Sequence, residues 1–172
     1  LADLAIDTKE QLRVEALDAL ADKGYHTGEE LKRCSEENIR TYVAPVASSQ
    51  RSRKHPDFTK GQFTYDEQTD TYRCPAGETL TTKGRWYEKR GSRKGQKTYG
   101  FKRYEAPLEV CRACPFAEQC GPFSRGHGRY IERTEYDDYA EANRRRVEAN
   151  KEYYRRRQAI VEHPFGTIKR QW

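Results

Sequence analysis

The stretch YYRRRQAIVEHPFGTIKRQW, residues 153–172, places one carboxylate, Glu162, among cations and apolar side chains. A lone carboxylate in such surroundings has two common roles. It can be a solvated ion-pair partner, which stabilises a fold only weakly, or it can hold a metal ion that works on phosphate. Pro164 lacks a backbone N–H and restrains His163, so a helix that leads to Glu162 should stop or kink beside it.

The composition favours a polyanionic partner. The chain has 172 residues, a net charge of +6, a pI of about 9.0 and a mean hydropathy of −1.16, with 12 Tyr and 6 Phe. Such a basic, aromatic chain fits nucleic acid, and its apolar core should be small. No apolar run approaches the roughly 18 residues that span a bilayer, so we expect no membrane partner. The chain begins at Leu1 and lacks Met, so we expect it to be part of a longer protein.

The first 45 residues predict an α/β arrangement. Hydrophobic periodicity and turn residues separate short apolar runs from amphipathic ones. The expected elements are a helix at about Thr8–Ala16, strands at Leu17–Ala21 and Asn38–Ala44, and a helix from Thr27 to about Glu37 that opens with a Thr27/Glu30 capping box.

Asp22 occupies the position that follows the first of these strands. Open α/β sheets place their chemistry at the carboxyl ends of strands, ahead of a helix. Asp is also a common turn and cap residue, which is the alternative interpretation.

The middle of the chain changes in character. Residues 45–62 indicate a polar linker, and residues 63–65 and 71–73 indicate a hairpin. Residues 83–103 contain nine Lys or Arg against the single acid Glu88, with aromatic residues interleaved. This pattern is typical of strands that bind nucleic acid, although a solvated basic loop would have the same composition. The candidate DNA contacts are Trp86, Arg90, Arg93, Lys94 and Lys97.

Five cysteines in irregular spacing indicate a reducing compartment and a metal rather than a disulfide framework. Cys74 and the run Cys111-x2-Cys114-x5-Cys120 supply four thiols, which is the number that tetrahedral Zn²⁺ takes. Buried thiols without metal, or His127 in place of one thiol, are the alternatives. We expect Cys34 to be a core residue of its helix.

Residues 132–161 form the longest stretch with helical composition. It lacks interior Gly and Pro, and acids crowd its start while arginines crowd its end, as the helix dipole favours.

Two blocks resemble one known family. Tyr154, Arg157, Glu162 and Lys169 resemble the Tyr-x2-Arg-x3-Glu-x6-Lys signature of insertion-sequence DDE transposases, although four residues rather than three separate Arg157 from Glu162. ADKGYHTGEEL, residues 21–31, resembles the block around the second catalytic Asp of the same family.

The resemblance implies a fold and a mechanism. The fold would be α/β, a partial ribonuclease-H-like core (residues 1–45) interrupted by a small β-rich zinc-binding insertion (46–128), with a long C-terminal helix that returns to the core (129–172). Two Mg²⁺ ions would be held by carboxylates, with Asp22 and Glu162 as the second and third ligands. The first Asp would lie upstream, so this chain alone should be inactive.

The resemblance also implies partners and a location. The enzyme would cleave DNA at transposon ends and join them to a target, as a homo-oligomer in the bacterial cytoplasm near the nucleoid. Tyr154, Arg157 and Lys169 would contact DNA, and the four cysteines would hold structural zinc.

Two other classes of protein remain open. In a non-catalytic, zinc-stabilised DNA-binding module, Asp22 and Glu162 would be structural remnants. A zinc module for protein interaction would explain the cysteines but not the two blocks.

Overall fold

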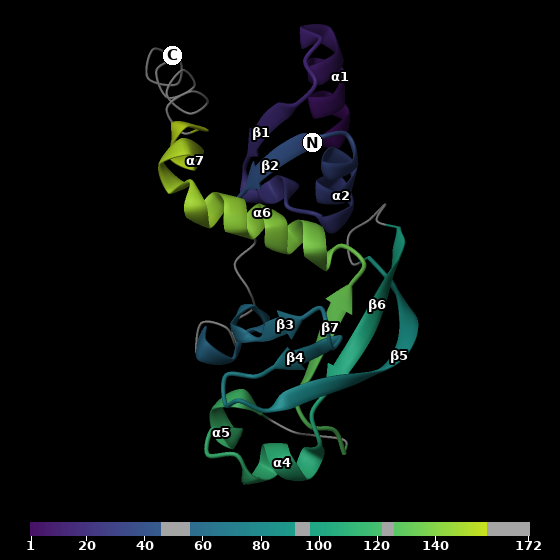
Figure 1. The fold of residues 1–172 in the computed structure, drawn as a ribbon, viewed down its shortest axis with the longest axis vertical. Coiled ribbons are helices and arrows are strands. Elements are labelled where there is room, and N and C mark those ends of the chain that lie inside the picture. Colours follow the sequence, from purple (N-terminus) through teal and green to yellow (C-terminus); the bar gives the residue numbers. More distant parts are fainter. Residues whose placement is uncertain (46–55, 92–96, 122–125, 158–172) are drawn as a thin grey trace, which may run out of the picture. The chain divides into compact units, whose positions relative to one another are not determined.

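The computed structural model describes residues 1–45, 56–91, 97–121 and 126–157, which fall into two compact units. The described part of the first unit comprises residues 1–45 and 136–157, and that of the second comprises residues 56–135 apart from the two gaps. Figure 1 shows the elements of both.

The first unit is built on two parallel strands. β1 and β2 pair in register from Leu17 opposite Ile39 to Ala21 opposite Val43, and helix α2 connects them. A parallel pair needs such a crossover. The elements of this unit are α1 (Ala2–Leu12), β1 (Leu17–Ala21), the 3₁₀ turn η1 (Lys23–Tyr25), α2 (Gly28–Glu36), β2 (Ile39–Val43), α6 (Asp137–Ala149) and α7 (Lys151–Arg157).

Small side chains make the core of the first unit. Ala2, Ala5 and Ala19 pack with Cys34 and Ile39. Cys34 is 0% exposed on α2, which confirms the prediction that it is a core residue. A second cluster joins Ala21, Leu31 and Val43 to side chains of α6. The apolar faces of α2 and α6 therefore cover the short sheet.

The predicted strands and second helix are confirmed, whereas the first helix was placed wrongly. α1 spans Ala2–Leu12 rather than Thr8–Ala16 and ends at Arg13 with φ 53°. The helix starts early because Ala2 and Ala5 are buried in the core. It ends early because the chain must turn before β1, and the left-handed conformation of Arg13 makes that turn.

Only half of the predicted capping box forms. The side chain of Thr27 accepts a hydrogen bond from the Glu30 backbone N–H at 3.4 Å, so Thr27 is the N-cap of α2. The carboxylate of Glu30 does not return to Thr27. It accepts from the Ala2 backbone N–H at 2.6 Å and so ties α2 to the start of α1.

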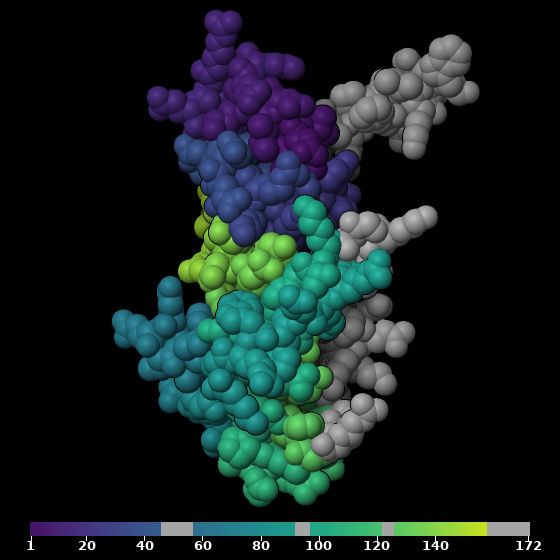
Figure 2. Space-filling model, turned by 90° about the vertical axis from the view of Figure 1, so that its right-hand side faces the viewer, coloured from purple at the N-terminus to yellow at the C-terminus, as the bar shows by residue number. Residues whose placement is uncertain are grey.

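The second unit is a curled antiparallel sheet with strand order β3-β4-β5-β6-β7. The predicted hairpin is confirmed, because β3 and β4 pair around residues 67–70. In Figure 2 the atoms of β5 (Thr79–Arg90) and β6 (Thr98–Glu105), in teal, lie on the surface that faces the viewer. The elements are η2 (Pro56–Phe58), η3 (Lys60–Gln62), β3 (Thr64–Asp66), β4 (Thr71–Arg73), β5 (Thr79–Arg90), β6 (Thr98–Glu105), α4 (Leu108–Ala113), α5 (Ala117–Cys120) and β7 (Tyr130–Thr134).

The long helix predicted from residue 132 is wrong in its first part. Residues 130–134 form β7, in which Ile131 and Arg133 are buried and their neighbours are not. This alternation is the period of a strand. Helix begins at Asp137, breaks at Asn150 and resumes as α7, whose described part ends at Arg157. Together the two units make a mixed α/β protein.

Candidate functional site

Asp22 lies directly after β1, as predicted. Its Oδ1 accepts a hydrogen bond from the Lys23 backbone N–H at 2.6 Å, and it is the N-cap of η1. The capping role therefore exists, but the side chain is exposed and keeps oxygen lone pairs that face solvent. A carboxylate held this way at the end of a parallel strand can bind a cation as well.

Helix α7 packs against β1, the strand that Asp22 follows. The Tyr154 hydroxyl donates a hydrogen bond to the backbone oxygen of Ala21 at 3.2 Å. The guanidinium of Arg157 lies over the Tyr154 ring, 5.7 Å from its centroid. Tyr154 of the terminal block is thereby held beside the residue that precedes Asp22, 133 positions away in the chain, and Arg157 contacts Tyr154.

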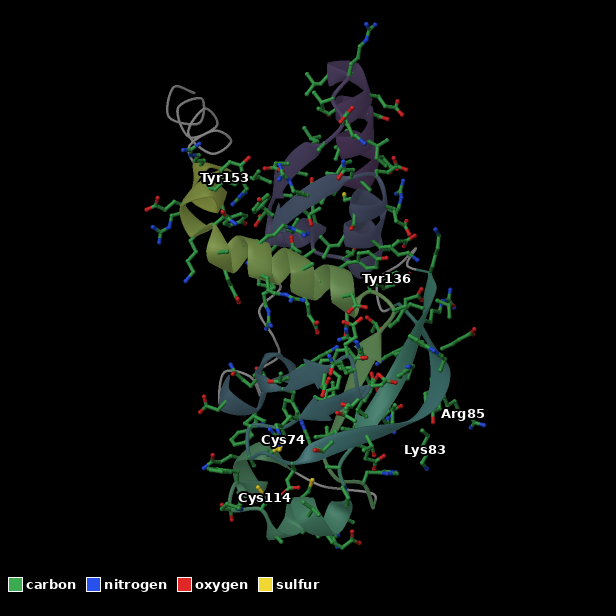
Figure 3. The ribbon with its side chains drawn as sticks, in the orientation of Figure 1. Cys74, Lys83, Arg85, Cys114, Tyr136 and Tyr153 are labelled. Atoms are coloured by element: carbon green, nitrogen blue, oxygen red, sulfur yellow. The ribbon has the colours of Figure 1, made fainter. Side chains whose placement is uncertain are left out.

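The neighbouring tyrosine adds a second attachment. The Tyr153 hydroxyl donates to Asp18 Oδ2 at 3.2 Å, and Asp18 Oδ1 accepts from Arg40 Nε at 2.6 Å. The Tyr153 ring meets Tyr42 edge to face at 5.2 Å. Burial and the Asp18 carboxylate raise the pKa of Tyr153, so it remains a hydroxyl donor at neutral pH. Figure 3 labels Tyr153 on α7.

Helix α6 is joined to β2 by a buried amide. Asn143 is 0% exposed and exchanges two hydrogen bonds with Val43, accepting from its N–H at 2.9 Å and donating to its oxygen at 2.8 Å. Arg146 donates to the Thr41 oxygen at 3.1 Å, and burial lowers the pKa of Arg146. These side chains take the place of a neighbouring strand along β2.

Sequence reasoning missed these positioning residues. The only signal was an Asn in a helix interior, where Asn is unfavourable unless its amide has a use.

Two predicted site residues, Glu162 and Lys169, lie outside the described residues. Within residues 1–45, 56–91, 97–121 and 126–157, no three His, Cys, Asp or Glu side chains are arranged to hold a metal ion. Asp22 is therefore the one predicted magnesium ligand whose position is known. An oxygen donor fits Mg²⁺ in kind, and the other ligands have to come from elsewhere.

The four cysteines predicted to bind zinc line one small cavity in the second unit. Cys74 comes from the turn after β4, Cys111 from α4, Cys114 from the residue that ends α4, and Cys120 from α5. The cavity holds about 30 Å³, room for one small atom or ion. Figure 3 labels Cys74 and Cys114 close to one another beside α4 and α5.

Backbone N–H groups point at two of these sulfurs. Cys74 Sγ accepts from Glu78 N at 3.3 Å, across a turn in which Gly77 has φ 91°. Cys111 Sγ accepts from Arg129 N at 3.2 Å. Burial raises the pKa of Cys111, and the neighbouring thiols of Cys74 and Cys114 raise it further. The donor set and its N–H groups fit a thiolate-binding cation, although the sulfurs are not arranged as a finished ligand set.

The predicted DNA contacts lie in or near the β5–β6 hairpin. Trp86 is 54% exposed, and Lys102 Nζ lies 5.4 Å from its ring centroid. Arg90 ends β5 and Lys97 precedes β6, both exposed. Arg93 and Lys94 lie outside the described residues.

Neither a membrane-spanning helix, among the described residues, nor a curated relative was found for this protein. No helix within the described ranges is long and apolar enough to cross a membrane. No curated protein and no solved structure matches the chain.

The class of protein follows from a family comparison. A family model described as a transposase DDE domain matches residues 73–172, which is more than half of the chain. The chain belongs to this family. Membership implies an enzyme of transposition-related DNA cleavage and transfer, with DNA as substrate. The match begins after Asp22, so the assignment of Asp22 depends on the resemblance of residues 21–31.

Proposed function

We propose that this chain is part of a DDE transposase of an insertion sequence, which cleaves and transfers DNA strands with Asp22 and Glu162 as two of its metal-binding carboxylates. The observation that carries the proposal is the hydrogen bond from the Tyr154 hydroxyl to Ala21, at 3.2 Å. It fixes the helix that leads to Glu162 beside the residue that precedes Asp22. The contact supports the proposal because it joins the chain beside Asp22 to the helix whose described part ends five residues before Glu162, and 139 residues lie between the two carboxylates.

The roles of the chain's own residues follow from this arrangement. Asp22 would present its remaining oxygen lone pairs at the strand end, while the bond that Oδ1 accepts from Lys23 N restricts the rotation of the carboxylate. Tyr153 and Tyr154 would hold α7 in place. Arg157 and Lys169 would contact DNA phosphates, for which cations are suited. Two bound Mg²⁺ ions would activate the attacking oxygen and stabilise the leaving one.

The test is cleavage and strand transfer by the full-length protein on DNA that carries its element ends. We expect Asp22→Asn and Glu162→Gln to abolish detectable activity, because each removes a metal ligand. The exposed carboxylate Asp7 provides the control, and Asp7→Asn should be active.

A metal-specificity switch gives a second readout. Asp22→Cys should be inactive with Mg²⁺ and regain activity with the softer Mn²⁺, because thiolates are poor ligands for Mg²⁺. Full activity of Asp22→Asn would refute the catalytic assignment.

We also propose that Cys74, Cys111, Cys114 and Cys120 hold one structural Zn²⁺. The supporting observations are their shared cavity and the N–H groups aimed at two of the sulfurs. Metal analysis of protein purified without added zinc should give one Zn²⁺ per chain. Cys120→Ser should lower this ratio, whereas Cys34→Ser should leave it unchanged because Cys34 lies in the other unit.

Gly128 offers a test that leaves every thiol in place. A Cβ at this position would lie 2.3 Å from the Ala106 oxygen and 3.0 Å from Cys111 Sγ. Gly128→Ala should therefore displace Cys111 and weaken zinc retention against a chelator. Gly24→Ala is the control, because a Cβ there meets nothing within 4 Å. Protein without metal would refute the zinc proposal and leave the catalytic one standing.

The alternative, a non-catalytic zinc-stabilised DNA-binding module, predicts a different outcome. Such a protein would bind DNA equally well with Asp22→Asn, and the unaltered protein would not cleave it in Mg²⁺ or Mn²⁺.

A further inference from the structure

The long strand β5 contains an irregularity that gathers cations. Thr82 pairs with Tyr104 and Trp86 pairs with Lys102, so Lys83, Gly84 and Arg85 all lie opposite Arg103. Gly84 has φ 71°, and its N–H binds the Thr82 hydroxyl at 3.2 Å. A bulge of this kind bends a strand and redirects its side chains. Figure 3 shows Lys83 and Arg85 projecting outward from the bend of β5.

These cations line a groove. Its volume is about 460 Å³, within the range of roughly 300–1,000 Å³ for sites that take small molecules or nucleotide-sized groups. Lys83, Arg85 and Arg103 supply positive charge, and Tyr87 supplies an aromatic wall. Among the described residues of the lining Glu105 is the one acid, and its Oε1 shares a hydrogen bond with His127 Nδ1 at 2.8 Å.

The three cations have few partners of their own. Within the described residues no ion pair involves Lys83 or Arg85, and both are exposed. Arg103 reaches Glu132 only at 3.6 Å, and its buried Nε lacks a hydrogen-bond partner within the described part of the chain. Three cations that outnumber the acids beside them destabilise a fold slightly. An anionic ligand would offset that cost.

A second hollow on the same hairpin shows why this groove is the better candidate. It holds about 540 Å³ and is lined by Trp86 and Tyr99 but also by two carboxylates, Glu88 and Glu135, and no Lys or Arg is among the described residues that line it. Glu135 accepts from Gly100 N at 2.7 Å. A phosphate would be repelled there. The two neighbouring hollows are therefore similar in size but differ in the charge of the side chains that line them.

We propose that the groove lined by Lys83, Arg85 and Arg103 holds the sugar-phosphate backbone of one unpaired DNA strand, with a base stacked on Tyr87. The inference deepens the proposed function and rests on it, because DNA is the substrate of that function. Tyr87 is 40% exposed, and its other face stacks on Phe101 at 5.5 Å, which holds the ring in place. Tyr130 is a second aromatic ring near these cations, and the guanidinium carbon of Arg103 lies 4.4 Å from its centroid. Stacking on such rings needs the base faces that a duplex conceals.

The test uses the full-length protein and two labelled DNA probes of one mixed sequence, a single strand of about 12 nucleotides and its duplex. Fluorescence anisotropy over a salt series gives the affinity and its salt dependence. The variant Lys83→Gln/Arg85→Gln removes two exposed cations from the groove. The matched control Arg73→Gln/Arg112→Gln removes two exposed cations from the same unit outside the groove.

We expect the groove variant to bind the single strand about tenfold more weakly at low salt. The slope of log affinity against log salt should fall by about 1.4, since each single-strand phosphate contact contributes about 0.7. Tyr87→Leu should weaken single-strand binding at least about fivefold, with little effect on the duplex. The control pair should change neither probe by more than about twofold. Thermal unfolding of each variant checks that its fold is intact.

Equal losses from the groove pair and the control pair would overturn the inference, because net charge alone would then explain binding. An equal loss for single strand and duplex would overturn it too, since the groove would then contact duplex DNA. The proposed function fails differently: the unaltered protein would bind neither probe, or Asp22→Asn would cleave normally.

Discussion

The two units differ in how far along the chain their stabilising contacts reach. In the first unit the hydrogen bonds that join the helices to the sheet link residues 100 to 135 positions apart, such as Val43 to Asn143 and Asp18 to Tyr153. The second unit is one continuous segment whose strands pair with their neighbours in order. Closing a long loop costs conformational entropy before any contact offsets it. The first unit therefore depends on a few distant contacts, while the second can be stabilised by many nearer ones.

The cores differ as well. The first unit buries mostly small side chains, whereas the second buries Tyr72 and Tyr104, with rings 5.0 Å apart, and packs Tyr65 against them. Buried tyrosines need partners for their hydroxyls. Asp70 accepts from Tyr65 at 2.8 Å and from Tyr104 at 2.6 Å, and Arg133 donates to Tyr72 at 2.9 Å. Polar contacts in the second unit thus lie inside its own sheet.

The largest effect should come from removing the side-chain amide of Asn143, which bonds to Val43 across 100 positions of the chain. Asn143→Leu would leave the N–H and oxygen of Val43 buried without partners, each costing about 1–3 kcal/mol. We expect a loss of about 3–5 kcal/mol in free energy of unfolding, measured by urea denaturation. Trp86 fluorescence, read in a Trp172→Phe background because Trp172 is the other tryptophan of the chain, reports on the second unit and should change little at the first transition. If Asn143→Leu lowers the stability of both units equally, the two units unfold together.

The next effect tests close packing in the first unit. A Cβ on Gly28 would lie 2.4 Å from Cβ of Tyr136, the residue that precedes α6. Gly28→Ala should destabilise by about 1–3 kcal/mol, as overpacking does. A substitution at Tyr136 to Gly, which removes that Cβ together with the ring, should restore part of the loss in the double variant. Gly24→Ala, with open space around it, serves as control for the thermal unfolding measurement.

A pH titration tests the second unit. Hydrogen bonds from Tyr104 and Lys102 lower the pKa of Asp70 to about 2, from 3.8. A lowered folded-state pKa means that the stabilisation is complete above about pH 4 and is lost as the pH falls toward 2. Since 36% of the side chain is exposed, solvent screening should limit the effect to about 1 kcal/mol.

Asp70→Asn isolates that charge. Asn tolerates the left-handed conformation of residue 70, φ 49°, so the backbone should not be strained. Its free energy of unfolding at pH 7 should be lower by about 1 kcal/mol, and its dependence on pH between 4 and 2 should be flatter. An unchanged pH profile would show that Asp70 does not carry the effect.

The smallest effect should come from a local contact. The Thr27 cap is long, at 3.4 Å, so Thr27→Ala should cost only about 0.5 kcal/mol by thermal unfolding. A loss above about 2 kcal/mol would mean that Thr27 does more than cap α2.

Sequence reasoning succeeded where neighbours in the chain decide the structure. The Leu17–Ala21 strand, the Thr27 cap and the hairpin around residues 67–70 follow from apolar runs and turn residues a few positions apart. It failed at residues 132–136, because the composition favours a helix while pairing with β6 buries Ile131 and Arg133 as a strand. Pairing with a neighbouring strand can override helix propensity.

The sequence by itself determined the family, the basic character of residues 83–103 and the position of Asp22 at the end of a strand. Each of these depends on residue types at fixed spacing. Only the tertiary structure decided that Tyr154 bonds to Ala21, that Asn143 takes the place of a strand beside Val43, and that a bulge brings Lys83 and Arg85 to Arg103. The physical reason is that these contacts join positions 18 to 133 residues apart, and their energies depend on how the packed elements meet.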